Sequence, residues 1–515
     1  MGKEFGDYQT PPGLVSRVLS RIGMGGRRWS RVLEPTCGTG GFIRGLLDSP
    51  APPDEIVGIE IQDAHLIQAR RFESAKARTR VRIMQANLFE LDLARDLSWR
   101  AKGPLLVIGN PPWVTNSTLG AIGSRNLPVK SNLKGLSGIN ALTGASNFDL
   151  AESIWLKLIR ELRDERPAIV LLCKTIVARN VLQYLRERSI PFSSAWIRRL
   201  DARRYFKASV DACLFYLEIG GSELTFEVPV FSDFESSMPE SVLGFVGGRI
   251  LSDISRYRRA ASIDGTCPFV WRQGIKHDAA RVMELRREGE QLINGLGEPV
   301  DVESDYLFPL FKSSDLNRKP HIQPILRVIV PQRRIGDDTT RLRTEAPKLW
   351  KYLSMHSFHF ERRKSSIYKG RPPFSIFGIG DYSFSPFKVA VSGFGRVPRF
   401  RLIWPAGGRP VMLDDTCYFI ACESSRQAAL LAALLIHRHT ADFLQAIIFA
   451  DSKRPLTKRL LQRIDLIELL NRVGREEILS EADRLLLRLH KDATKEHRGW
   501  PEDLRILLRP PASRE

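Results

Sequence analysis

The sequence lacks the marks of a metalloprotein, of a disulfide-rich protein and of a membrane protein. Its six cysteines are scattered, with no Cys-x-x-Cys pair and no cluster with histidine. We therefore expect no metal site, and we expect free thiols in a cytoplasmic protein. No run of eighteen apolar residues occurs and no signal peptide opens the chain, so we expect a soluble protein without a membrane partner.

Acidic residues are also in short supply. The chain has 58 aspartates and glutamates against 78 lysines and arginines, which gives a formal net charge of +20 and a pI of about 9.9. An excess of this size predicts a polyanionic partner more than it predicts a fold, although a generally basic, soluble surface would give the same number. With 515 residues, the chain is long enough for two or three domains.

Hydrophobic periodicity divides the chain into parts of different character. Residues 1–220 alternate short apolar strands with amphipathic helices, which predicts one doubly wound α/β domain. Residues 221–470 have irregular strands, loops and a few helices, including one long apolar helix over 426–449, which predicts a mixed α+β domain. Residues 471–515 are charged, and we expect them to form a helical tail.

The most informative stretch is an apolar run, Leu105–Ile108, followed by Asn110, Pro111, Pro112 and Trp113. The run predicts a buried parallel strand, and open α/β sheets place their ligand crevice at the carboxyl ends of such strands. Two prolines remove backbone donors, Asn110 adds a side-chain carbonyl, and Trp113 adds a flat face. The unpaired backbone carbonyls of the turn and the side-chain carbonyl of Asn110 are acceptors beside a stacking surface. Such a set suits a planar, conjugated amino group. The alternative is an ordinary proline turn that caps a strand.

Two further strand ends predict contacts with a ligand. A short strand over 31–34 ends in Glu34, and Gly38 and Gly40 follow in a turn that opens a helix, where backbone amides can approach a ligand closely. This turn lacks the third glycine of a Gly-x-Gly-x-x-Gly loop, so it could also be a simple strand-to-helix connection. The strand over 56–61 ends near Glu60, whose carboxylate suits the two hydroxyls of a ribose.

The next strand, 81–84, is followed by Asn87 and Leu88. Asn87 could bond to the edge of an adenine while Leu88 packs on its ring, or Asn87 could cap the next turn.

Two segments have more positive than negative charge. Residues 114–147 contain no acidic residue but include Lys130 and Lys134, and a loop this long is usually functional or disordered. Residues 312–371 contain 15 basic and 5 acidic residues, which favours a local binding face over uniform solubilisation.

Taken together, these motifs resemble those of the gamma class of amino-DNA methyltransferases from restriction–modification systems, and the resemblance covers most of the chain. It implies a Rossmann-like, S-adenosylmethionine-dependent catalytic domain over 1–220 and a mixed α+β target-recognition domain over 221–470. Asn87 replaces the aspartate that the family often has at this position. The residues that the resemblance assigns to S-adenosylmethionine are Thr10, Glu34, Gly38, Gly40, Glu60, Ile61, Asn87, Leu88 and Asn147.

The same resemblance implies methyl transfer to the N6 amino group of a flipped adenine. Asn110 and the Pro111 carbonyl would hold the amino hydrogens, and Trp113 and Phe206 would sandwich the base, with Tyr205 replacing Phe206 if the register slips by one. The family motif ends more often in tyrosine than in tryptophan. The catalytic set is Asn110, Pro111, Pro112, Trp113 and Phe206.

The expected partner is double-stranded DNA, and a separate restriction endonuclease is a further possible partner. We expect the enzyme to be a monomer and to belong to a restriction–modification or phage-defence system. The residues expected to contact DNA are Lys130, Lys134, Arg362, Arg363, Lys364, Lys453 and Arg454.

Other functions remain open. Methylation of the N4 of cytosine or of an RNA base would use similar chemistry, since polyanion binding does not distinguish nucleic acids. Methylation of a glutamine amide would use the same motif but would not need a large basic second domain. A non-catalytic DNA-specificity subunit is a further alternative, and the intact Asn110–Trp113 motif weighs against it. No Pro-Cys follows the fourth strand, which argues against methylation of a cytosine carbon through a covalent adduct.

Overall fold

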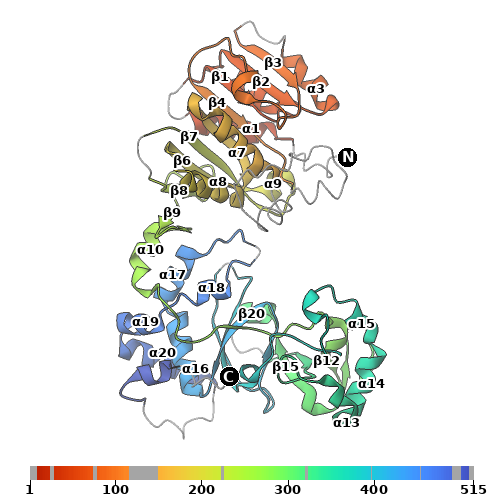
Figure 1. Cartoon of the computed structure of the whole chain (residues 1–515). Coiled ribbons are helices and arrows are strands. Elements are labelled where there is room, and N and C mark those ends of the chain that lie inside the picture. The colour runs from red at the N-terminus through yellow and green to blue at the C-terminus, as the bar shows by residue number, and fades with distance from the viewer. Residues whose placement is uncertain are drawn as a thin grey trace. The chain divides into compact units, whose positions relative to one another are not determined.

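The computed structural model describes residues 9–23, 28–73, 78–114, 149–221, 225–318, 323–395, 397–452, 454–489 and 500–509. The chain forms two compact units, Met1–Ile254 and Ser255–Glu515 (Figure 1). Within the described residues, no helix is long and apolar enough to cross a membrane.

The first unit is built on one ten-stranded sheet. In spatial order its strands are β10 (Arg249–Leu251), β9 (Ser241–Val246), β8 (Val228–Phe231), β6 (Phe192–Asp201), β7 (Asp211–Ile219), β5 (Ala168–Lys174), β4 (Leu105–Gly109), β1 (Arg31–Glu34), β2 (Glu55–Glu60) and β3 (Arg80–Gln85). Strands β5, β4, β1, β2 and β3 are parallel, whereas β7 lies antiparallel between β5 and β6. The five-residue run of β4 is buried throughout, as expected for a central parallel strand with both faces covered.

Helices cover this sheet (Figure 1). They are α1 (Pro12–Gly23), α2 (Gly41–Leu47), α3 (Asp63–Ala69), α4 (Leu93–Asp96), α7 (Leu150–Leu162), α8 (Thr175–Glu187) and α9 (Ala202–Phe206). The chain order reverses between β1 and β4, because β2 follows β1 on one side while β4 lies on the other. At such a switch point the loops from neighbouring strands diverge and leave a crevice at the carboxyl ends.

The first unit extends beyond the predicted boundary at residue 220. Strand β8 pairs in parallel with β6, and β9 and β10 continue the same sheet as antiparallel neighbours. These three short strands therefore belong to the first unit, which ends at Ile254.

The second unit contains two smaller sheets. The four-stranded sheet has the order β11 (Arg272–Gln273), β20 (Cys417–Cys422), β17 (Phe387–Ser392) and β18 (Arg401–Ile403). The six-stranded sheet has the order β14 (Pro299–Val300), β13 (Gln291–Ile293), β12 (Glu284–Glu288), β16 (Leu326–Ile329), β15 (Leu307–Phe311) and β19 (Met412–Leu413).

The helices of the second unit form two groups (Figure 1). One group lies beside the six-stranded sheet and includes α13 (Leu342–Glu345), α14 (Pro347–Met355) and α15 (Ser357–Glu361). The other contains α10 (Ile254–Ala260), α16 (Ser425–Ile436), α17 (Arg438–Ile447), α18 (Lys458–Leu461), α19 (Leu466–Val473) and α20 (Arg475–Leu489). Two short helices, α11 (Ala280–Met283) and α12 (Ser313–Asn317), complete the unit.

Two predictions about this unit differ from the structure. The long helix expected over 426–449 is two helices, because His437 adopts an extended backbone conformation and its Nδ1 accepts a hydrogen bond from the His439 N–H at 3.2 Å, which starts α17. The described part of the tail is helical but does not stand alone, since α20 packs against α16 and the Gln427 side chain donates to the Leu507 carbonyl at 3.1 Å.

Candidate active site at the carboxyl ends of the central strands

A pocket opens where β1, β2, β3 and β4 end, and the first turns of α7 complete its wall. The predicted site residues that line it are Thr10, Glu34, Gly38, Glu60, Ile61, Asn87, Leu88, Asn110 and Pro112. Residues from five separate segments of the sequence therefore meet at one edge of the sheet.

Several lining residues were not predicted from the sequence. Phe42 and Ile59 are core residues that also reach the pocket, and Phe89 follows the predicted pair Asn87–Leu88. Leu150 and Ile154 lie one turn apart on α7 and therefore share a face. Their helical spacing was visible in the sequence, but nothing in it indicated which face of the helix would meet the pocket.

The glycine turn after β1 requires backbone conformations that other residues rarely adopt. Gly38 has φ 54° and Gly40 has φ 84°, both in the left-handed region that glycine enters without steric cost. Gly40 is the N-cap of α2 and does not line the pocket itself, whereas Gly38 does. The turn thus brings the backbone of Gly38 to the pocket wall.

Glu60, at the end of β2, holds this turn in place. One carboxylate oxygen accepts a hydrogen bond from the Gly38 N–H at 2.8 Å, and the other accepts from the N–H groups of Ile61 at 2.8 Å and Gln62 at 2.7 Å. The residue is only 6% exposed. Each carboxylate oxygen can accept more than one hydrogen bond, so Glu60 can organise the turn and still accept from a ligand hydroxyl.

Glu34, at the end of β1, is the unusual carboxylate of the pocket. It is 2% exposed, and within the described residues its Oε2 has no hydrogen-bond partner. Burial raises the pKa of this carboxyl well above its ordinary value, the Ile43 N–H opposes the shift, and the negative charge of Glu60 adds to it. A buried carboxylate oxygen without a partner is costly, so this position suits a cationic group of a ligand.

Asn87 has a local bonding role that competes with the predicted ligand contact. Its Oδ1 accepts from the Phe89 N–H at 3.1 Å, and its Nδ2 donates to Glu90 Oε1 at 3.0 Å. The side chain therefore caps the turn, which was one of the two alternatives. The neighbouring Leu88 is buried and contributes an apolar wall to the pocket.

The Asn110–Trp113 turn leaves β4 directly into the site. Asn110 and Pro112 line the pocket, whereas Pro111 and Trp113 are buried beside it. Trp113 Nε1 donates to the Leu172 carbonyl of β5 at 3.3 Å, which fixes the plane of the indole. Within the described residues, the Pro111 carbonyl accepts no hydrogen bond, so it is available as an acceptor.

Phe206, the last residue of α9, contacts Trp113 directly, whereas the resemblance implied a base held between the two rings. The ring centroids are 5.0 Å apart and the planes meet at 76°, an edge-to-face contact. The two rings do not form the parallel walls of a sandwich. A planar group that lies parallel to the indole would meet the ring of Phe206 at the same steep angle.

An ion pair that was not predicted supports the wall of the pocket. Lys174, at the end of β5, donates to Asp149 Oδ2 at 2.6 Å, and Asp149 Oδ1 caps α7 by accepting from the Ala151 N–H at 3.0 Å. Asp149 is therefore tied both to the sheet and to the helix that carries Leu150.

The predicted DNA-contacting residues of the second unit differ in their surroundings. Arg362 and Lys364 are exposed. The guanidinium of Arg363 instead donates to the carbonyls of Ser375 at 2.7 Å and Phe360 at 3.1 Å and lies 3.6 Å from the ring centroid of Tyr368. Arg363 thus holds the fold together, and we leave it out of the proposed binding set.

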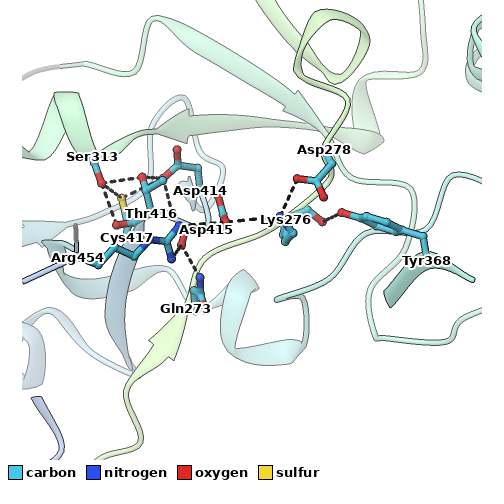
Figure 2. Close-up of polar contacts among 10 residues, drawn as sticks. All are labelled: Gln273, Lys276, Asp278, Ser313, Tyr368, Asp414, Asp415, Thr416, Cys417 and Arg454. Atoms are coloured by element: carbon cyan, nitrogen blue, oxygen red, sulfur yellow. Dashed lines mark hydrogen bonds and ion pairs between the residues drawn. The ribbon is translucent and has the colours of Figure 1, made fainter. Parts of the chain in front are cut away.

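Arg454 is partly held by an acidic neighbour (Figure 2). Its Nη2 lies 3.6 Å from Asp415 Oδ2, and the same carboxylate oxygen lies 3.9 Å from Lys276 Nζ. Four other predicted residues, Asn147, Lys130, Lys134 and Lys453, lie outside the described residues.

Comparison with known proteins identifies similar chains, although no family model matches the sequence. Over 464 residues the chain is 36% identical to the type II methyltransferase M.NspV of Nostoc sp. (strain ATCC 29411 / PCC 7524), covering 90% of this chain and 96% of that protein. It is 28% identical over 165 residues to a type II methyltransferase of Thermus thermophilus, covering 32% of this chain and 33% of that protein.

A solved structure of the type IIL restriction-modification enzyme MmeI in complex with DNA is similar in fold. It aligns with a TM-score of 0.51 at 12% identity and covers 97% of this chain and 74% of that one.

Proposed function

The chain belongs to the type II methyltransferase family, and we propose that it methylates the N6 amino group of an adenine flipped out of double-stranded DNA. Its cofactor is S-adenosylmethionine, and it is a methyltransferase of the restriction–modification type. Within that setting we propose a modification enzyme that acts as a monomer and protects DNA against a separate restriction endonuclease.

The observation that carries the proposal is the position of the Asn110–Trp113 turn. It follows the central strand β4, places Asn110 and Pro112 on the pocket wall, and holds the buried indole of Trp113 by its hydrogen bond to the Leu172 carbonyl. The turn also carries two carbonyl acceptors, the side chain of Asn110 and the backbone of Pro111. Such a set suits a planar amino group, because the acceptors take its hydrogens while the aromatic face supports its ring.

The pocket residues fit S-adenosylmethionine. The partnerless Oε2 of buried Glu34 suits the cationic amino group of the cofactor, and Glu60 can accept from the ribose hydroxyls while it holds the Gly38 turn. Leu88 and Ile61 supply apolar surface for the adenine ring. When bound, the cofactor supplies an electrophilic methyl group on a sulfonium.

The residues of the turn prepare the target nitrogen. Its lone pair is conjugated with the ring, and the side-chain oxygen of Asn110 and the carbonyl of Pro111 would accept its two hydrogens and direct the lone pair toward the methyl group. Most of the acceleration would come from this positioning. No thiol nucleophile is required, and burial raises the pKa of the Cys37 thiol far above its ordinary value, which keeps it neutral.

The exocyclic nitrogen is out of reach inside a duplex, so the base has to leave the stack. A flipped base that stacks parallel to Trp113 would touch Phe206 with its edge, given the 76° between the two rings. This arrangement replaces the sandwich that the resemblance implied.

Two features favour adenine over cytosine. Position 110 is asparagine, whereas enzymes that methylate the N4 of cytosine more often resemble Ser-Pro-Pro-Trp. The cofactor turn precedes the catalytic turn and the larger basic unit follows both, an order that resembles the gamma class. Trp113 favours cytosine instead, because tryptophan is common at this position in enzymes that methylate the N4 of cytosine, but its face would stack on either base.

Mass spectrometry of nucleosides tests the proposal. Purified enzyme is incubated with labelled S-adenosylmethionine and either unmethylated duplex DNA or RNA, with Asn110→Ala as the control. The expected product is N6-methyladenine in DNA alone. N4-methylcytosine as the sole product would overturn the adenine assignment, methylation of RNA alone would overturn the DNA substrate, and no methylated nucleoside would overturn the reaction.

A further inference from the structure

Two neighbouring arginines of the second unit are held by one carboxylate on the surface. Asp381, which begins a short 3-10 helix over Asp381–Phe384, accepts from Arg333 Nε at 2.8 Å through Oδ1 and from Arg334 Nε at 3.1 Å and Nη2 at 2.5 Å through Oδ2. Arg333 also lies 4.6 Å from the ring centroid of Phe384, which in turn contacts Phe308 edge to face at 5.4 Å. We call Arg333, Arg334 and Asp381 the arginine clasp.

The backbone beneath the arginine clasp is fixed as well. Asp337 Oδ2 accepts from the N–H groups of Arg333 at 3.0 Å and Arg334 at 2.8 Å. Gln332, which is buried, donates to the Arg334 carbonyl at 2.7 Å and accepts from the Ile376 N–H at 2.9 Å. The side chains of Gln332 and Asp337 therefore hold the backbone of this exposed turn, and Asp381 holds the two guanidinium groups that it carries.

Stability does not explain this arrangement. The two arginine side chains are 59% and 64% exposed and the Asp381 side chain is 46% exposed. Exposed ion pairs contribute about 0–1 kcal/mol because solvent and salt screen them. Within the described residues, the two terminal nitrogens of Arg333 and Nη1 of Arg334 bond to no protein group. Oriented donors that face solvent are instead typical of a binding surface, since less rotamer entropy is lost on contact.

The charge of the arginine clasp suits base edges better than phosphates. Asp381 cancels one of the two positive charges and would repel a phosphate. In the major groove, by contrast, guanidinium groups pair with the O6 and N7 acceptors of guanine, and a carboxylate accepts from the N4 amino group of cytosine. Arg362 and Lys364 differ, since within the described residues neither has an acidic partner, and they suit phosphates.

We propose that the arginine clasp makes major-groove contacts with base pairs of the target site and so helps to determine which DNA sequence is methylated. This inference rests on the proposed function, because it takes double-stranded DNA as the substrate. It adds named specificity-determining residues to the second unit.

The test compares methylation rates on a panel of duplexes. The target site is first identified by sequencing the modified bases of DNA treated with the wild type, and the panel then contains that site and every single base-pair change in it. The variants are Arg333→Ala, Arg334→Ala and Asp381→Asn. The matched control is Arg343→Ala, because Arg343 is also exposed and also lies over an aromatic ring, Trp350 at 4.8 Å.

The arginine variants are expected to lower kcat/KM on the target site by about 5- to 150-fold, the range for one base-specific contact. On duplexes changed at the contacted base pair, variant and wild type should become equal, whereas the control should keep the wild-type profile. Asp381→Asn should relax preference at the same positions and strengthen binding to unrelated DNA, since it removes a negative charge.

Three results would overturn the inference. Equal loss on every duplex, with a salt slope reduced by about one per arginine, would make the arginines phosphate contacts. An unchanged profile in all three variants would remove them from the interface. A lowered melting temperature for Asp381→Asn with the wild-type profile would leave Asp381 only a structural role. A wild type that methylates no DNA would overturn the proposed function itself, so the two failures are distinguishable.

Discussion

Replacement of Glu60 by glutamine separates two roles of its carboxylate, which are to hold the Gly38 turn and to accept hydrogen bonds from the ribose of the cofactor. The side chain keeps its size, but it has one acceptor oxygen where the carboxylate has two. In the structure both oxygens are used by backbone N–H groups, one for Gly38 and the other for Ile61 and Gln62. If the amide oxygen stays with the latter pair, the amide NH2 faces the Gly38 N–H, and donor meets donor.

The magnitude follows from this lost contact. A hydrogen bond to a charged group contributes about 1.5–3 kcal/mol, and water cannot replace it easily because Glu60 is only 6% exposed. Since the Gly38 turn forms a wall of the pocket that we propose for the cofactor, we expect Glu60→Gln to weaken S-adenosylmethionine binding by about 10- to 160-fold, at about 1.4 kcal/mol per tenfold change.

Isothermal titration with two cofactors makes the measurement specific. One is S-adenosylmethionine, and the other is an analogue without the ribose hydroxyls. If Glu60 also accepts from the ribose, the loss caused by Glu60→Gln is smaller with the analogue. If Glu60 acts only through the turn, the two losses are equal.

The chain offers a matched control on the same strand. Glu55 begins β2, is 2% exposed, and accepts from the N–H groups of Arg100 at 2.7 Å and Ala101 at 2.9 Å, but it does not line the pocket. Glu55→Gln should leave the cofactor dissociation constant unchanged. An unchanged dissociation constant for Glu60→Gln would refute the reasoning for both of its roles.

Three further predictions concern the target base, the DNA backbone and the fold. Asn110→Ala should lower kcat about 10²- to 10³-fold, the usual loss for one positioned hydrogen-bonding group, with cofactor affinity nearly intact by titration; substantial remaining turnover would exclude the catalytic role. Charge reversal of Arg362 and Lys364 should weaken binding to all DNA sequences and flatten the salt dependence, whereas a loss limited to the target site would make them base contacts. Lys388 is 1% exposed, and burial lowers its pKa from 10.5 to about 7. The unfolded chain therefore binds the extra proton, so the contribution of Lys388 to stability rises with pH between about 7 and 10.5, by up to about 5 kcal/mol at 1.4 kcal/mol per unit. Lys388→Met should remove this rise in denaturant titrations, and a parallel pH profile for both proteins would contradict it.

Several of the predicted residues line one pocket because they share a simple rule. Glu34, Glu60, Asn87 and Asn110 each follow an apolar run that forms a parallel strand, and parallel strands of one sheet end at the same edge. Their convergence therefore needed only the strand assignment. The role of each side chain was harder to predict, because Glu60 and Asn87 bond to backbone N–H groups whose positions depend on the fold.

Features that depend on residues far apart in the sequence could not be predicted from it. The helix expected over 426–449 is a continuous apolar pattern, and its break at His437 comes from one backbone angle and one side-chain cap. Similarly, Arg333 and Arg334 are separated from Asp381 by nearly fifty residues, and no periodicity relates them. Pairings of this kind follow from tertiary packing and not from local pattern.

The basic segment 312–371 shows why net charge alone overstates the interface with DNA. Its arginines divide by environment: Arg363 is bound by carbonyls and a tyrosine ring, Arg334 is oriented by a carboxylate, and Arg362 is exposed without an acidic partner among the described residues. Only the last kind fits a phosphate contact, and each phosphate contributes about 0.9 to the slope of log K against log salt. The salt dependence of DNA binding should therefore be much shallower than the 15 basic residues of the segment suggest, and a slope near that count would mean that the arginines bound by carbonyls or by a carboxylate also neutralise phosphates.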